Sequence, residues 1–344
     1  MPLTGSISAP SFNYMLFKAF EVAESSEKEY KSALVTKSED DLPPGEVLIK
    51  VQYSSLNYKD ALSAIGNKGV TRNYPHTPGI DAAGTVEKSA DPHFNRGDKV
   101  IVTGYDLGMN TSGGFAEYIR VPASWPVHLP EGLSRKRSMM FGTAGLTAAL
   151  SVYNLKKQGI TPPNGKIIVT GASGGVGSLA VAILSHLGFH VTAVTGKEDA
   201  VELLLDLGAK EVIPRAAIDD HSGKPFLKAQ YAAAIDTVGG NILATVLKSL
   251  NYGGVATCCG LVSSPELHTT IYPFILKGIR LIGIDSVLCD HHLRREIWEH
   301  LATDWRPAKM DKIVSVCTLD TIQEHLDSML KGQLTGRYIV KISS

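Results

Sequence analysis

The sequence has few cysteines, and this bounds both its location and its chemistry. Its 344 residues include only four, Cys258, Cys259, Cys289 and Cys317, and no two are spaced as a C-x-x-C pair. Neighbouring cysteines such as Cys258 and Cys259 bridge poorly, so a disulfide framework is excluded, and a cysteine-based zinc site is not expected. We therefore expect the protein to reside in the reducing cytoplasm.

Long apolar runs and net charge are also missing. The most apolar stretch, Leu179–Leu187, is far shorter than the ~18–20 residues that cross a bilayer, and no basic cluster with an apolar core opens the chain. Lysines and arginines number 34, as do aspartates and glutamates. This balance removes the usual electrostatic reason for binding nucleic acid or an anionic membrane. We expect no signal peptide, no membrane partner and no nucleic-acid partner.

What is present indicates two domains, as the length suggests. Residues 1–14 are small and polar and are expected to form a flexible arm. Residues 15–137 contain short β-like runs separated by glycine and proline, which predict a β-rich domain. Strands and helices alternate over residues 138–287, a pattern that favours a parallel sheet covered on both faces. The tail, residues 288–344, adds amphipathic helices and a closing strand. The predicted fold class is therefore α/β.

The strongest local signal is a glycine-rich turn between a buried strand and a helix. The strand Lys166–Thr170 runs into Gly171-Ala172-Ser173-Gly174-Gly175-Val176-Gly177, and the helix Val176–Leu187 follows. Glycines let the backbone approach a pyrophosphate, and the start of the helix offers free N–H groups to phosphate oxygens. Because strand, turn and helix occur in the required order, we predict a dinucleotide site. A turn used only for tight packing is the alternative.

The end of the next strand favours NADPH over NADH. An NAD site usually has Asp or Glu at this position, whereas this chain has Thr195-Gly196-Lys197. A lysine and a hydroxyl can form charge-assisted hydrogen bonds to a 2′-phosphate, which a carboxylate would repel. We predict Lys197 as the phosphate clamp and Arg215 as a second candidate. The alternative for both is an ordinary solvated surface charge.

Several further stretches together resemble a known family. The β-rich first part, the connecting helix, the glycine turn and the returning tail resemble the medium-chain dehydrogenase/reductase superfamily. Particular motifs are similar to those of the YhdH/YhfP-type quinone oxidoreductases, a group that includes NADPH-dependent acryloyl-CoA reductases. These motifs are Ser54–Asp60, Pro78–Gly84, Gly142–Thr147, Val169–Gly177, Ala234–Gly239 and Pro273–Leu276.

The resemblance implies a fold and a set of site residues. It implies a GroES-like catalytic domain over residues 15–137, completed by 288–344, and a Rossmann domain over 138–287. It further implies that the following residues line NADPH: Tyr58, Ser173, Gly174, Gly175, Val176, Thr195, Gly196, Lys197, Arg215, Leu261, Ile275 and Ser286. Leu261 and Ser286 also follow predicted strands, where ligands of parallel sheets bind. Thr147, in the connecting helix, is a candidate nicotinamide contact, with helix packing as the alternative.

The resemblance also indicates which chemistry to expect. Zinc-dependent members carry a cysteine where this chain has Asn57-Tyr58, and a His-Glu pair where it has Ile80-Asp81, so we expect no metal site. Tyr58 is the catalytic candidate, because a phenol can stabilise an enolate or deliver a proton. A tyrosine that only packs against the cofactor is the alternative. Asn57, Lys59 and Asp60 are expected to shape the loop and form a salt bridge rather than take part in the chemistry.

Three functions remain open at this stage. The first is zinc-independent, NADPH-dependent reduction of an activated C=C bond in acryloyl-CoA or a similar short enoyl-CoA. The second is NADPH:quinone oxidoreduction, and the third is an NADPH-binding sensor without turnover. The hydrophobic strand expected at Ile279–Val287 would lie at the edge of the Rossmann sheet. An open edge invites pairing, so we predict a homodimer joined there.

Overall fold

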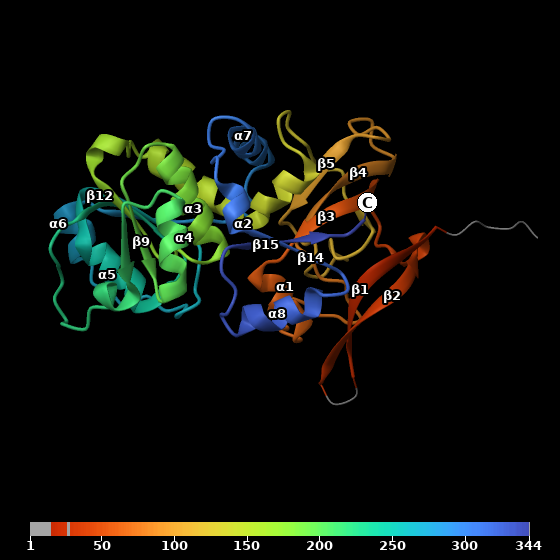
Figure 1. Cartoon of the computed structure of the whole chain (residues 1–344), viewed down its shortest axis with the longest axis horizontal. Helices are drawn as coiled ribbons and strands as arrows, with labels where there is room; N and C mark the ends of the chain where they lie inside the picture. Colours follow the sequence, from red (N-terminus) through yellow and green to blue (C-terminus); the bar gives the residue numbers. More distant parts are fainter. Residues whose placement is uncertain (1–14, 26–27, 344) are drawn as a thin grey trace, which may run out of the picture.

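Two β-sheets connected by one long helix organise the chain (Figure 1). The structure is a computed structural model, and it describes residues 15–25 and 28–343. The arm predicted at residues 1–14 lies outside the described residues. The larger two sheets lie on either side of the helix α2 along the molecule's long axis (Figure 1).

The first sheet consists of six parallel strands in the order β10-β9-β8-β11-β12-β13. Their bounds are β8 Lys166–Val169, β9 Val191–Thr195, β10 Glu211–Pro214, β11 Tyr231–Asp236, β12 Leu250–Cys258 and β13 Arg280–Gly283. The strand order reverses direction at β8, where parallel α/β sheets bind ligands. Fully buried Ile167, Ile168 and Val169 show why β8 is central, since both of its faces are covered.

Helices cover this sheet and follow its strands in turn. They are α3 Gly175–His186, α4 Val201–Asp206, α5 Gly240–Ser249 and α6 Tyr272–Lys277. One buried cluster joins α2 and α3 to one face, and a second joins α5 to the other. The predicted doubly wound α/β arrangement is therefore confirmed.

The second sheet has seven strands and is mostly antiparallel. Six run in the order β14-β15-β3-β4-β5-β7, and β6 pairs with β3. Their bounds are β3 Val47–Ser55, β4 Asp81–Ser89, β5 Lys99–Thr103, β6 Tyr118–Val121, β7 Val127–His128, β14 Val314–Thr318 and β15 Arg337–Lys341. β15 lies near the end of the sequence and pairs with β3, which lies near its start. The tail therefore completes this sheet. A separate hairpin, β1 Leu16–Glu24 and β2 Tyr30–Ser38, extends from it.

The remaining helices attach the tail and the connection to both sheets. They are α1 Tyr58–Ala64, α2 Arg135–Lys157, α7 His291–Ala302 and α8 Ile322–Leu330. Trp298 of α7 is fully buried and meets Phe141 of α2 edge-on, with ring centroids 6.5 Å apart. The domain boundaries predicted after residues 137 and 287 both lie close to this helix pair, and they stay predictions.

A kink in α2 brings the helix against the second sheet. Gly142 has φ 54° and ψ −156°, which is not helical. A Cβ at Gly142 would lie 2.4 Å from both Asp81 Oδ2 and Ser55 Oγ, so glycine is required by space as well as by conformation. The backbone after Gly142 therefore approaches the Asp81 carboxylate.

The sequence missed several elements. It did not predict β2, β7 or β14, and it left the helix α1 as the loop containing Tyr58. β2 contains no buried residue, and β14 is mostly exposed. α1 has only seven residues, too few for a helical period to show. Within the described part of the chain, no helix has the length and apolar character needed to cross a membrane.

Candidate functional site

The glycine turn after β8 is held tightly by its own backbone. Gly171 has φ +58°, and a Cβ there would lie 2.3 Å from Thr237 Oγ1. A Cβ at Gly177 would lie 2.2 Å from the Gly171 carbonyl oxygen. Both positions exclude larger residues, so the turn stays close to β8 and delivers the chain directly into α3.

The start of α3 has backbone N–H groups without a hydrogen-bond partner inside the helix. Its N-cap residue, Gly174, has no side chain to cap the helix, and Gly175 and Val176 form the first turn. The first N–H groups of a helix have no partner within the helix, and they carry a partial positive charge. This end of α3 can therefore accept an anion such as a phosphate group.

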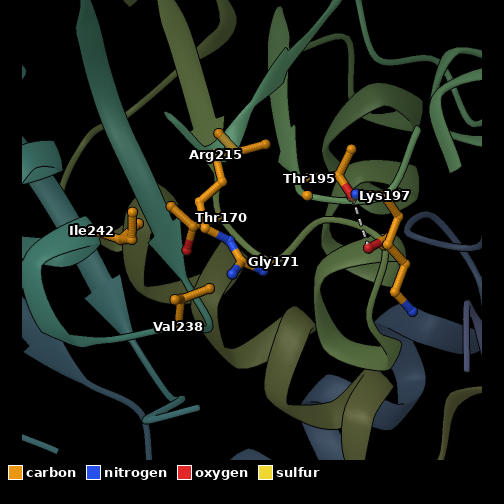
Figure 2. Close-up of a pocket in the computed structure, with 10 residues that line it drawn as sticks. Thr170, Gly171, Thr195, Lys197, Arg215, Val238 and Ile242 are labelled. Atoms are coloured by element: carbon orange, nitrogen blue, oxygen red, sulfur yellow. Dashed lines mark hydrogen bonds between the residues drawn. The ribbon is translucent and has the colours of Figure 1, made fainter. Parts of the chain in front are cut away.

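A pocket lies beside this turn, at the carboxyl ends of β8, β9 and β10 (Figure 2). Its empty space is about 340 Å³, open solvent included. The lining residues are Thr170, Gly171, Ser173, Val194, Thr195, Gly196, Lys197, Arg215, Val238 and Ile242. Two of these described residues are cationic and none is acidic. The pocket thus suits a ligand that carries negative charge.

Arg215 supplies the cation inside this pocket. It follows β10 at the start of a short 3-10 turn, and its side chain extends toward Gly171 and Val238 (Figure 2). The guanidinium also lies beside the next loop, since a Cβ at Gly196 would be 3.2 Å from Arg215 Nη2. A guanidinium in this position offers several donors to one phosphate.

Lys197 points away from Arg215 (Figure 2). Its Nζ donates to the Leu334 carbonyl at 2.6 Å and to Thr335 Oγ1 at 3.4 Å, both in the tail before β15. Partial burial lowers the pKa of this amine. In this arrangement Lys197 therefore ties the end of β9 to the tail, and Arg215 is the cation directed into the pocket.

Two buried hydroxyls complete the near side of the pocket. Thr195 Oγ1 donates to Ser173 Oγ at 3.0 Å, and it accepts from the Lys197 backbone N–H at 3.0 Å. Both side chains are buried. The sequence predicted Ser173, Thr195, Gly196, Lys197 and Arg215 as site residues, and the structure gathers all five around this pocket.

Tyr58 is the first residue of α1. Asn57 caps this helix reciprocally with Asp60, whose Oδ2 accepts from the Asn57 N–H at 2.7 Å. The Tyr58 side chain is 46% exposed, and no described residue forms a hydrogen bond with its hydroxyl. A phenol with a free hydroxyl at a rigid helix start is available to bind a substrate oxygen.

A buried polar cluster lies directly behind Tyr58. Asp81 Oδ2 accepts from Ser55 Oγ at 2.5 Å and from Asn57 Nδ2 at 2.7 Å. Asp81 Oδ1 accepts from Thr143 Oγ1 at 2.5 Å, and the Thr143 N–H also donates to this carboxylate. The Arg337 guanidinium donates to Ser55 Oγ at 2.8 Å. We call these five residues the Asp81 cluster.

Asp60 has a different environment from the one expected. Instead of forming a salt bridge, it accepts hydrogen bonds from the backbone N–H groups of Asn57, Gly79 and Ile80. Burial, with the nearby charge of Asp81, raises the pKa of Asp60 to about 7. The expected salt bridge is therefore wrong, because the carboxyl is used to fasten the turn before β4 to the start of α1.

Thr147 and Ser286 are brought together although 139 residues separate them. Their hydroxyls lie 2.8 Å apart, and Thr147 Oγ1 also donates to the Thr143 carbonyl. Ser286 follows β13, and both side chains are buried. This pair joins the connecting helix to the edge of the first sheet.

Leu261 and Ile275 are not gathered into the pocket. Leu261 follows β12 and is 65% exposed, and Ile275 lies on α6 and is 64% exposed. The sequence also missed several residues that the structure places in the site. Asp81, Thr143 and Arg337 were present in its motifs or strands, but no local pattern links them, because residues far apart in the sequence meet only in the folded chain.

Two family models and several known proteins match this chain. Residues 43–131 match the alcohol dehydrogenase GroES-like domain, and residues 175–303 match the zinc-binding dehydrogenase model. The acrylyl-CoA reductase AcuI of Ruegeria pomeroyi is 42% identical over 330 residues, which cover 96% of this chain and 100% of that protein.

Two solved structures agree with this comparison. The YhdH oxidoreductase of Salmonella enterica, in complex with NADP, is 42% identical with a TM-score of 0.92, over 95% of this chain and 100% of the other. YhfP of Bacillus subtilis, whose name assigns it to the quinone oxidoreductases, was solved with NAD bound. It is 44% identical with a TM-score of 0.93, over 95% of this chain and 99% of the other. The chain therefore belongs to the YhdH/YhfP and AcuI family of the medium-chain dehydrogenase/reductase superfamily.

Proposed function

We propose that this protein uses NADPH to reduce an activated C=C bond, with acryloyl-CoA or a similar short enoyl-CoA as substrate. The observation that carries this proposal is the acid-free pocket beside the glycine turn, with Arg215 directed into it. A relative at 42% identity is named acrylyl-CoA reductase, and a structure of another relative contains NADP.

The described residues fit a dinucleotide with a 2′-phosphate. The pyrophosphate would lie at the start of α3, against Ser173, Gly174, Gly175 and Val176. Arg215, with the hydroxyl of Thr195 and the loop Gly196-Lys197, would hold the 2′-phosphate. Thr147 and Ser286 are proposed contacts of the nicotinamide end, together with Tyr58. Leu261 is proposed because it also follows a strand of the parallel sheet, β12, whereas Ile275 rests on the family resemblance alone.

The donor set near Tyr58 does not fit the zinc that one family model carries in its name. The Asp81 cluster contains no thiol and no imidazole, the ligands that zinc sites in this fold would use. Both Asp81 oxygens already accept hydrogen bonds from Ser55, Asn57 and Thr143. Elsewhere in the described ranges, no three His, Cys, Asp or Glu side chains gather at one point. The residues present therefore do not fit a catalytic zinc ion.

The proposed reaction needs a hydride, a proton and stabilisation of one oxygen. When bound, NADPH supplies the hydride, which forms a C–H bond at the β-carbon while the C=C electron pair moves toward the thioester carbonyl. The Tyr58 hydroxyl donates a hydrogen bond to that oxygen and stabilises the enolate. A proton then reaches the α-carbon from Tyr58 or from water, which completes the saturated thioester.

Quinone reduction is the second candidate, because the 44% identical YhfP is named as a quinone oxidoreductase. The same hydride could reduce a quinone carbonyl system, with Tyr58 donating to its oxygen. This reaction requires no additional residue, so direct assay must separate the two.

We expect NADPH oxidation to be much faster with acryloyl-CoA than with a benzoquinone when the two are compared by kcat/KM. The expectation follows the 42% identical relative that is named acrylyl-CoA reductase, and an enoyl thioester offers an oxygen for Tyr58 and a β-carbon for the hydride. The decrease in NADPH absorbance measures both rates. A ratio that strongly favours the quinone would reverse the assignment, and no oxidation with any enoyl-CoA, enone or quinone would favour a sensor.

Removing the Arg215 guanidinium should weaken discrimination between the two coenzymes. In Arg215→Gln we expect the KM for NADPH to rise about 10- to 100-fold, because one or two charge-assisted hydrogen bonds to the 2′-phosphate are lost. The KM for NADH should change little, because NADH has no 2′-phosphate. Lys197→Gln is the matched comparison, and its effect should be smaller because Lys197 donates to Leu334. An equal change for both coenzymes in Arg215→Gln would contradict the assignment.

Tyr58→Phe should lower kcat without a matching change in coenzyme affinity. General-acid or oxyanion assistance by one group is worth roughly 10²–10⁴-fold, so we expect a loss in the lower part of that range. The measurement is steady-state kcat with acryloyl-CoA, alongside NADPH affinity by fluorescence. If kcat is unchanged, Tyr58 only packs against the cofactor.

We further propose a cytoplasmic homodimer. All four cysteines are free thiols, which suits a reducing compartment. β13 is the last strand of its sheet, so one of its edges has no neighbouring strand among the described residues. Exposed apolar side chains accumulate nearby on α6 and the segment before it, among them Ile271, Tyr272, Ile275 and Leu276. Pairing of two β13 edges about a two-fold axis would cover them.

Light scattering should give about twice the chain mass of 36.9 kDa at micromolar concentration. Leu276→Asp should shift the protein toward the monomer, because it places a charge in the apolar contact. Leu16→Asp, at a similarly exposed position on β1, is the control and should leave the mass unchanged. A monomeric wild-type protein would refute the dimer.

A further inference from the structure

The four residues Leu334–Arg337 connect the tail to both halves of the proposed site. We call them the bridging segment. The Leu334 carbonyl accepts from Lys197 Nζ at 2.6 Å, and the Gly336 N–H donates to the Ser173 carbonyl at 3.0 Å. Gly336 has φ +74°, and a Cβ there would lie 2.4 Å from the Ile313 carbonyl oxygen. The segment therefore follows a constrained path over the glycine turn.

Arg337, the last residue of this segment, contacts the turn that leads to Tyr58. Its Nη1 donates to the Leu56 carbonyl at 2.9 Å and to Asn57 Oδ1 at 3.3 Å, and its Nη2 donates to Ser55 Oγ. The side chain is 3% exposed. Three consecutive residues before Tyr58 are thus held by one guanidinium, including the residue that caps α1.

The same side chain lies against the start of α3. A Cβ at Gly175 would be 3.3 Å from both Cδ and Nη1 of Arg337, so the arginine fills the space that a larger residue would need. Its Nε also lies 3.4 Å from the Met140 carbonyl, just before the kink of α2. One side chain therefore contacts the proposed pyrophosphate cradle, the connecting helix and the Tyr58 turn.

We propose that Arg337 is a positioning residue that fixes Tyr58 relative to the bound coenzyme, an inference that rests on the proposed function. Arg337 acts through Asn57, because Asn57 caps the helix on which Tyr58 is the first residue. Displacement of a reacting group by about 1 Å can cost 10²-fold in rate. Arg337 contacts both the start of α3 and the turn before Tyr58. It can therefore fix the distance between the bound coenzyme and Tyr58 more directly than the packing of the two sheets can.

Buried charge explains why this residue is an arginine. Burial lowers the pKa of the Arg337 guanidinium, and the nearby charges of Asp81 and Asp60 offset part of this effect. A planar guanidinium can donate to Leu56, Asn57 and Ser55 at once, whereas a lysine ammonium is a point charge with one nitrogen. Arg337→Lys therefore keeps the charge balance but loses the fixed geometry.

The experiment compares Arg337→Lys and Arg337→Met with the wild-type enzyme, using NADPH and whichever acceptor the wild type reduces. We expect kcat to fall about 10-fold in Arg337→Lys and about 100-fold in Arg337→Met, as misplacement of Tyr58 predicts. The KM for NADPH should change much less than kcat, because the backbone N–H groups at the start of α3 remain in both variants. Rates are expressed per molecule that binds NADPH, measured by fluorescence, so unfolded protein does not contribute.

A double-mutant cycle with Tyr58→Phe separates positioning from a merely structural role. If Arg337 acts through Tyr58, Arg337→Lys should have much less effect on kcat in the Tyr58→Phe background. Val86→Ala, a core truncation in β4 away from the site, is the control for lost stability and should keep the wild-type kcat.

The outcomes are distinguishable. A wild-type kcat in Arg337→Lys, or full additivity with Tyr58→Phe, overturns the positioning role even when the wild type is an active reductase. Absence of turnover by the wild type with every acceptor overturns the proposed function instead. Arg337→Lys retains a cation for Asp81 and Asp60, so the test stands even if Arg337→Met fails to fold.

Discussion

The hydrogen bonds of one buried carboxylate hold the candidate site together. Asp81 receives donors from Ser55, Asn57 and Thr143, which lie on β3, before α1 and after the kink in α2. Unpaired, a buried carboxylate would be strongly destabilising, so each of these donors must be kept in place. Gly142 is part of the same constraint, since any side chain there would displace the carboxylate. Asn57, which donates to Asp81, is the N-cap residue of α1, so the hydrogen bonds of Asp81 also help to fix Tyr58, the first residue of that helix.

The two halves of the site depend on different physical effects. The cofactor half is formed mainly by the backbone. It consists of a close-packed glycine turn, a helix start without a side-chain cap, and the strand ends next to β8, where the strand order reverses. The Tyr58 half uses buried polar side chains that satisfy one another, with the phenol left exposed at the surface. Backbone cradles bind the invariant part of a coenzyme, whereas the polar cluster fixes the group that would meet the substrate.

The comparison between Lys197 and Arg215 shows how tertiary contacts change an assignment. Both were candidates from sequence, with Lys197 first because it follows β9 directly. In the folded chain the Lys197 amine reaches the Leu334 carbonyl, while Arg215 extends toward the glycine turn. A long side chain can reach several partners from one position, so its place in the sequence does not specify which one it meets.

The sequence by itself determined the alternation of strands and helices in the Rossmann half, the glycine turn and the cluster of Ser173, Thr195 and Arg215 near it. These features are local or follow the period of a strand or helix, so they can be read without knowing what packs against what. Only the tertiary structure decided the helix that carries Tyr58, the hydrogen bonds of Asp60 and Asp81, and the reach of Arg337 from the tail. Those contacts join residues up to 282 positions apart, and their partners are selected by the burial of polar groups when the two sheets close on α2, which no short-range pattern records.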